Sequence, residues 1–197
     1  EYRNLNDVTD MLAYRESMKE HDGTGNGKVP YNWRLDAIKW CHKVYAMTDT
    51  SLQITESEVK GGWLIWLDAD TVTKRPLSEE KLKEFLNDKA EISHLGRTAT
   101  DYSETSFVAF NLDYQAPHLL LADLRGCYDT GEVVSYREWH DGFIFERLLN
   151  IYSAHGMKVQ NLSPVVKDLD AFGVSPLAYY MDHFKGNKKE DVTKHGH

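Results

Sequence analysis

The stretch GGWLIWLDADTVTKRPL, residues 61 to 77, decides the fold class, because a run of apolar residues ends there in two aspartates. Residues 63–67 follow two glycines and predict a short strand that is buried on both faces. Asp68 and Asp70 come at its carboxyl end, where open α/β sheets place their ligands. Two carboxylates one residue apart suit a hard divalent cation. The stretch therefore predicts an α/β protein with a metal site at a strand end.

Composition limits the class of protein further. The chain has 197 residues, of which 41% are hydrophobic, and a net charge of -8. This length suffices for one well-cored domain, and the absence of a long apolar run predicts no membrane span. The acidic balance argues against nucleic acid as a partner, because protein surfaces that bind nucleic acid are usually basic. Cys41 and Cys127 form no CxxC pair, which predicts buried free thiols and favours a cytoplasmic location.

Hydrophobic periodicity and turn residues predict alternating helices and strands. The expected helices are residues 7–20, 33–47, 78–88, 117–124, 139–155 and 175–181, and the expected strands are 63–67, 91–95, 106–112 and 159–162. Residues 21–30 are rich in glycine but lack the spacing of a phosphate-binding loop, so we expect an ordinary loop. This order of elements is typical of α/β proteins.

A second motif, HFKGNKK at residues 183–189, supplies the other groups that a metal–diphosphate site needs. The imidazole of His183 can join Asp68 and Asp70 around Mn²⁺, which accepts both oxygen and nitrogen ligands. Gly186 permits close approach of the backbone to a phosphate, and a neighbouring lysine can neutralise it.

Taken together, WLDADTV and HFKGNKK resemble motifs of the GT-A glycosyltransferases, especially the glycogenin-like and lipopolysaccharide galactosyltransferase-like enzymes of glycosyltransferase family 8. That family combines an apolar strand and a DxD motif with a C-terminal HxxGxxK motif, which Asp68, Asp70, His183, Gly186 and Lys189 match here. The resemblance implies a GT-A-like mixed sheet flanked by helices.

The resemblance covers roughly residues 31–189, and we expect a single glycosyltransferase-like domain over residues 1–197. In GT-A enzymes a first strand that binds the nucleobase lies well upstream of the DxD motif. No such strand is evident before Trp33, and the chain begins at Glu1 instead of a methionine. We therefore expect that the N-terminal part of the domain is truncated.

The implied activity is the transfer of a sugar from a nucleotide-sugar donor, usually a UDP-sugar, to a hydroxyl of an unknown glycan, lipid or protein acceptor, with retention of anomeric configuration. Mn²⁺, or Mg²⁺, held by Asp68, Asp70 and His183 would act as a Lewis acid on the departing diphosphate. Lys189, with Lys188 beside it, would add electrostatic stabilisation.

Four further residues are candidates for contact with the donor. Arg34, and after it Lys39, are the basic residues expected to reach the nucleotide, although both equally suit a solvated helix face. Asp141 occupies the place of the acidic residue that lies near the sugar hydroxyls in the family. Glu104 begins a segment, residues 104–112, that resembles the family strand after the acceptor-side loop, and it is a candidate for orienting the sugar or accepting a proton. In this segment Glu-Thr-Ser replaces the Asn-Ala-Gly that is common in the family.

The aromatic residues next to Asp141 have structural alternatives. His140 is more readily explained as a helix cap or a core residue than as a ligand. Trp139 is more readily explained as core than as a platform on which a sugar stacks.

Two other functions remain open on sequence alone. The apolar strand and DxD motif also resemble those of haloacid-dehalogenase-like phosphatases, in which the first aspartate, here Asp68, is the nucleophile. Asp168 and Asp170 would then be the only later acidic pair available for Mg²⁺. Alternatively, the chain is a non-catalytic module that binds a sugar or a nucleotide.

Overall fold

The computed structural model describes residues 4–57, 61–98, 100–163 and 170–184. Its contacts divide the chain into two compact units. The first unit contains residues 1–64 and 111–157, and the second contains residues 65–110 and 158–197. Among the helices in these described ranges, none has both the length and the apolar character needed to cross a membrane.

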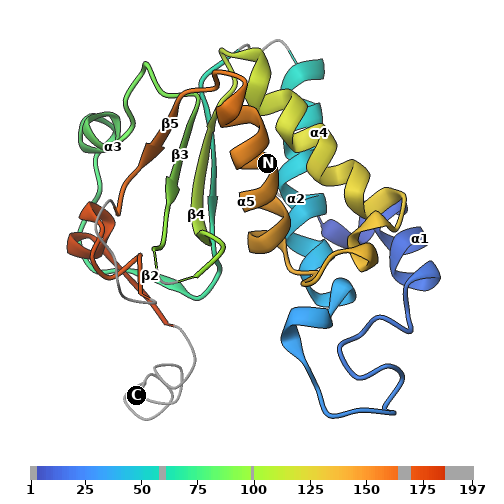
Figure 1. Cartoon of the computed structure of the whole chain (residues 1–197). Helices are drawn as coiled ribbons and strands as arrows, with labels where there is room; N and C mark the ends of the chain where they lie inside the picture. The colour runs from blue at the N-terminus through green and yellow to red at the C-terminus, as the bar shows by residue number, and fades with distance from the viewer. Residues whose placement is uncertain (1–3, 58–60, 99, 164–169, 185–197) are drawn as a thin grey trace. The chain divides into compact units, whose positions relative to one another are not determined.

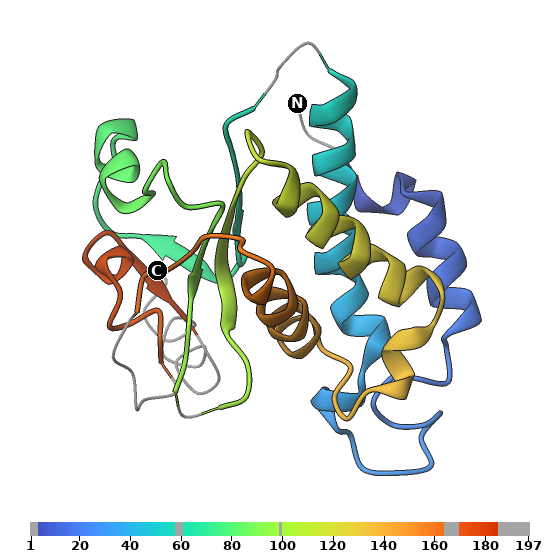
Figure 2. The ribbon, with the colours of Figure 1, turned by 45° about the horizontal axis from the view of Figure 1, so that its top comes forward.

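The first unit is helical. Its helices are α1 (Thr9–Ser17), α2 (Ala37–Glu56), α4 (Gln115–Asp129) and α5 (Asp141–Ala154), with 3-10 turns at Leu5–Asp7, Trp33–Leu35 and Glu132–Ser135. Helix α2 packs on α4, and α4 packs on α5, as Figures 1 and 2 show. Three buried tyrosines, Tyr14, Tyr45 and Tyr128, join α1, α2 and α4. The Tyr14 ring lies 5.8 Å from Tyr45 and 5.6 Å from Tyr128, so these rings form an aromatic cluster within the core of this unit.

Side-chain caps fix where two of these helices begin. Asp36 precedes α2, and its Oδ1 accepts a hydrogen bond of 2.8 Å from the backbone N–H of Lys39. His140 precedes α5, and its Nδ1 accepts a hydrogen bond of 3.2 Å from the N–H of Phe143. Each cap satisfies a backbone donor that the first turn of a helix leaves without a partner. The capping role expected for His140 is therefore confirmed.

Helices α2 and α4 are longer than predicted. Helix α2 continues past Met47 to Glu56, and the hydroxyls of Thr48, Thr50 and Thr55 bond back to carbonyls four residues earlier. These bonds satisfy the threonine hydroxyls within the helix. Thr48 and Ser51 are buried, so polar residues continue the packed face of α2 beyond the apolar stripe. Helix α4 likewise runs through Gly126 to Asp129, because Cys127 and Tyr128 beyond the glycine are buried.

Most of the main sheet belongs to the second unit. The strand order is β1 (Trp63–Leu67), β4 (Glu104–Asn111), β3 (Ile92–Leu95) and β5 (Val159–Asn161). Strand β3 pairs antiparallel with β4 and parallel with β5. The protein is thus α/β with a mixed sheet, as predicted, and Figure 1 shows the four strands side by side.

The prediction that the strand at residues 63–67 is buried on both faces is wrong. The strand exists, but four of its residues are half-buried and Leu67 is exposed. Strand β1 lies at the edge of the sheet, whereas β4 beside it is central and almost fully buried. The apolar run therefore forms an edge strand, in which large tryptophan and leucine side chains pack on the sheet with one side still open to solvent.

A second, two-stranded sheet was not predicted. Strands β2 (Thr71–Thr73) and β6 (Met181–His183) pair antiparallel, with Thr71 opposite His183. Phe184 donates its N–H to the carbonyl of Asp70 at 3.0 Å, which extends this pairing by one residue. The second unit also contains helix α3 (Glu79–Phe85), capped by Ser78, and a 3-10 turn at Pro176–Tyr179 where a helix was expected. The small sheet brings the region after the DxD motif next to the second motif.

Candidate metal centre

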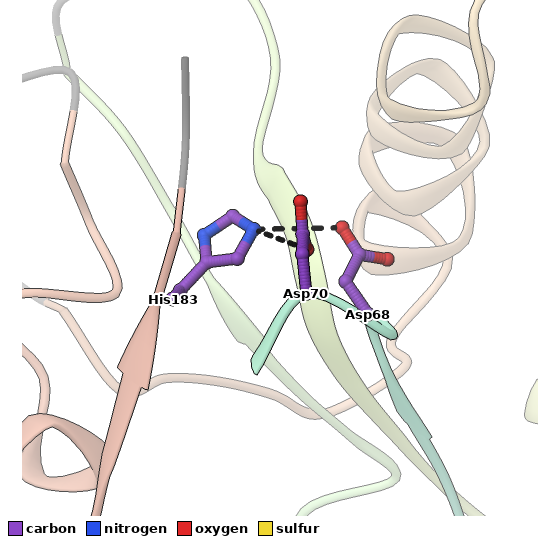
Figure 3. Close-up of side chains that lie close together, drawn as sticks. All are labelled: Asp68, Asp70 and His183. Carbon is purple, nitrogen blue, oxygen red and sulfur yellow. Dashed lines mark ion pairs between the residues drawn. The ribbon is translucent and has the colours of Figure 1, made fainter. Parts of the chain in front are cut away.

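Asp68, Asp70 and His183 form a cluster in the second unit. One possible ligand atom from each lies within 4.8 Å of the others. Nε2 of His183 is 3.1 Å from Oδ1 of Asp70 and 3.8 Å from Oδ2 of Asp68. Figure 3 shows the His183 ring on β6 pointing toward both carboxylates. The described residues contain one such group of three, and it is the group that the sequence predicted.

The backbone around the two aspartates holds their positions. The N–H of Asp68 bonds to the carbonyl of Ser106 at 2.9 Å, which ties the end of β1 to β4. The carbonyl of Asp68 accepts the N–H of Thr71 at 3.0 Å, which closes a turn around Asp70. Trp66 donates its indole N–H to Oδ1 of Asp68 at 2.7 Å. Because Oδ1 is engaged in this way, Oδ2 is the oxygen that faces His183.

A buried carboxylate lies on the other side of the His183 ring. Nδ1 of His183 is 3.1 Å from Oε1 of Glu104, and the Glu104 side chain is 3% exposed. Oε2 of Glu104 accepts from the Arg97 guanidinium at 2.5 Å and from the N–H of Ala171 at 3.0 Å. His183 is thus held between a paired, buried carboxylate and two partly exposed ones.

The geometry and the donor set both fit a divalent cation. Two carboxylates and an imidazole are ligands that Mn²⁺ accepts. Neighbouring ligand atoms at about 2.1 Å from an octahedral cation lie about 3.0 Å apart. The 3.1 Å separation between His183 and Asp70 matches this value, and the 3.8 Å separation to Asp68 corresponds to a wider angle.

A buried hydroxyl near the cluster, Oγ1 of Thr71, has no hydrogen-bond partner among the described residues. Thr71 lies directly opposite His183 in the β2–β6 pair, and directly opposite side chains share a face of a sheet. A hydroxyl left in this position suits a water or a ligand oxygen at the metal centre.

A pocket of about 180 Å³ adjoins His183. It is lined by Asp170, Phe172, Gly173, Ala178, Met181, Asp182, His183 and Phe184. Its walls combine aromatic and apolar side chains with two carboxylates, which is a mixture found in sites for small polar molecules.

The other predicted ligands of the donor are only partly described. Gly186, Lys188 and Lys189 lie outside the described residues. Arg34 forms an ion pair of 3.3 Å with Glu138, and the ammonium of Lys39 lies 4.8 Å from the centre of the Trp40 ring. Both basic residues belong to the first unit, whereas the metal cluster belongs to the second.

Asp141 is buried in the first unit. Its Oδ2 is 3.1 Å from the ammonium of Lys43, and the exposed fractions of the two side chains are 3% and 9%. Burial lowers the pKa of the neighbouring His140, which favours the neutral ring that caps α5. Trp139 is half-buried, and its ring meets that of His21 edge-on at 5.3 Å. Cys41 and Cys127 are buried and free, as predicted.

Two charged residues of these networks were not predicted. Lys43 lies in an amphipathic helix and Arg97 in a segment without periodicity, so neither has a local pattern that marks it as buried.

The acidic pair that the phosphatase interpretation requires gains no support from the structure. Asp168 lies outside the described residues, and Asp170, whose Oδ1 accepts the N–H of Gly173, is not a member of the metal cluster.

Comparisons of the chain with protein-family models, with curated proteins and with solved structures found no match.

Proposed function

We propose that the protein is a metal-dependent glycosyltransferase of the GT-A type, which transfers a sugar from a nucleotide-sugar donor to an acceptor hydroxyl. The observation that carries this proposal is the meeting of Asp68 and Asp70 with His183 at the end of β1. The two motifs are far apart in the sequence, and the β2–β6 pair places them side by side. A DxD motif alone is common, but one joined by a distant histidine is a more specific arrangement.

In this proposal Asp68, Asp70 and His183 hold Mn²⁺ or Mg²⁺, which supplies Lewis-acid stabilisation of the departing diphosphate. Gly186 lets the backbone approach the phosphates, and Lys188 and Lys189 neutralise the charge that develops on them. The bond between the anomeric carbon and the diphosphate breaks, with its electrons remaining on the phosphate oxygen. The acceptor hydroxyl attacks the oxocarbenium-like sugar, and its proton passes to the departing diphosphate, which leaves as the nucleoside diphosphate. Asp141 has no part in this step, because it is buried in an ion pair with Lys43, and Arg34 and Lys39 remain candidates for contact with the nucleotide.

The test is donor turnover. The protein is incubated with UDP-glucose, UDP-galactose and GDP-mannose, with and without Mn²⁺, and the released nucleoside diphosphate is measured by chromatography. We expect metal-dependent release that is lost in Asp70→Asn and His183→Ala. The matched control is Asp88→Asn, because Asp88 is an exposed carboxylate of the same unit that belongs neither to the metal cluster nor to the pocket beside His183.

Two outcomes would contradict this function. Release of phosphate from a simple monoester such as p-nitrophenyl phosphate, without any need for a sugar nucleotide, would indicate the phosphatase instead. Metal binding at the cluster without turnover of any donor would indicate a non-catalytic binding module.

A further inference from the structure

We infer that Glu104 is a positioning residue for the metal centre, which acts through His183 and not by touching the metal or the sugar. This inference rests on the metal site of the proposed function but not on nucleotide binding. It gives Glu104 a different role from the direct contact with the sugar that the sequence suggested.

The first argument is geometric. Glu104 Oε1 contacts Nδ1 of His183 at 3.1 Å, on the opposite side of the ring from the atom that faces Asp70. If Nδ1 donates its hydrogen to this carboxylate, Nε2 keeps its lone pair for a cation. Metal-binding histidines commonly donate their second N–H to a carboxylate, which fixes the tautomer and the orientation of the ring.

The second argument is that the carboxylate is itself held in place. Its other oxygen accepts from Arg97 at 2.5 Å and from the Ala171 N–H at 3.0 Å, and Ser106 Oγ donates to Oε1 at 3.2 Å. The side chains of Glu104 and Arg97 are only 3% and 5% exposed. The Arg97 guanidinium therefore pairs with this carboxylate inside the protein. Glu104 is therefore a fixed acceptor from three directions, and His183 supplies the fourth contact.

A structural role alone would also explain this burial, so the experiment must separate the two roles. Mn²⁺ affinity is measured by electron paramagnetic resonance titration in a double-mutant cycle of Glu104→Gln and His183→Ala. We expect Glu104→Gln to weaken Mn²⁺ binding by about 10- to 100-fold in the parent protein. The same substitution should have no further effect in the His183→Ala background, because its action passes through the ring.

Ser106→Ala is the matched control. It removes a hydrogen bond to the same oxygen of Glu104 but leaves the contact with His183, so Mn²⁺ affinity should stay close to that of the parent. Unchanged affinity in Glu104→Gln would overturn the inference. Equal weakening in both backgrounds would also overturn it, because that result indicates an effect of overall charge or structure.

A second measurement covers the case in which Glu104→Gln does not fold. The tautomer of His183 is read in the parent protein, without metal and at an alkaline pH at which the imidazole is neutral, from long-range proton–nitrogen correlations, with His183→Ala used for assignment. A neutral ring with its hydrogen on Nδ1 supports the positioning role. A hydrogen on Nε2 overturns it, even if the protein proves to bind or turn over no nucleotide sugar.

Discussion

The ion pair between Lys43 and Asp141 gives the sharpest test of how the helical unit is stabilised. Both side chains are almost fully buried, and their charged atoms are 3.1 Å apart. Replacement of Lys43 by methionine keeps most of the side-chain volume but removes the ammonium group. The carboxylate of Asp141 would then remain buried without its cation.

The size of the effect follows from the separation of the charges. At an effective dielectric constant of about 20, unit charges at 3.1 Å attract each other by about 5 kcal/mol. Removal of one partner from a buried pair usually costs about 3–5 kcal/mol, because the other charge stays desolvated. We therefore expect Lys43→Met to lower the free energy of unfolding by about 3–5 kcal/mol, which is a large part of the stability of a typical domain.

The assay is urea denaturation followed by circular dichroism. Lys39→Met is the control on the same helix, and because Lys39 is exposed it should cost less than about 1 kcal/mol. Lys43→Met combined with Asp141→Leu should be more stable than Lys43→Met alone, since it removes both charges. A loss below about 1 kcal/mol in Lys43→Met would refute the reasoning, because Asp141 would then not depend on this cation.

Three other predictions concern stability. Asp36→Ala removes the cap of α2 and should lower the free energy of unfolding by about 0.5–2 kcal/mol, as measured by urea denaturation. Burial raises the pKa of Cys41 to about 12, so stability should be full below pH 9 and fall as the pH rises toward 12, and Cys41→Ala should reduce this fall. The opposite outcome, an unchanged alkaline profile in Cys41→Ala, would show that the thiol does not contribute. Burial also lowers the pKa of His94 to about 4, so its contribution is full above pH 6.5 and lost as the pH falls toward 4. Thermal melts across this range should therefore be less sensitive to acid in His94→Gln, and an equally steep loss would contradict this.

The residues of the metal cluster could be predicted from the sequence, but the strands that bring them together could not. Asp68 and Asp70 could be placed at the end of a strand because a local apolar run marks that strand. His183 was assigned from its motif, and the strand that carries it was not predicted. Strands β2 and β6 have three residues each and pair over a long sequence separation, so no local period reveals them.

The buried charges show the same limit. Glu104 was a candidate from its position near the family's acceptor-side loop, but its contacts with His183 and Arg97 depend on tertiary packing. Lys43 shares a helix with exposed Lys39, and only the packing of α2 distinguishes the two. Composition and periodicity indicate which apolar residues are buried. A charged residue such as Lys43 is buried only where the fold supplies an opposite charge, here Asp141, and the sequence does not reveal that pairing.

The most direct test of the central claim is calorimetric titration of UDP and GDP into the protein, with and without Mn²⁺, in the parent and in Asp70→Asn and His183→Ala. The account predicts that a nucleoside diphosphate binds when Mn²⁺ is present, and that both substitutions abolish this binding. Binding that is independent of Mn²⁺ and unchanged in the two variants would contradict it, because the cluster would then not hold the diphosphate.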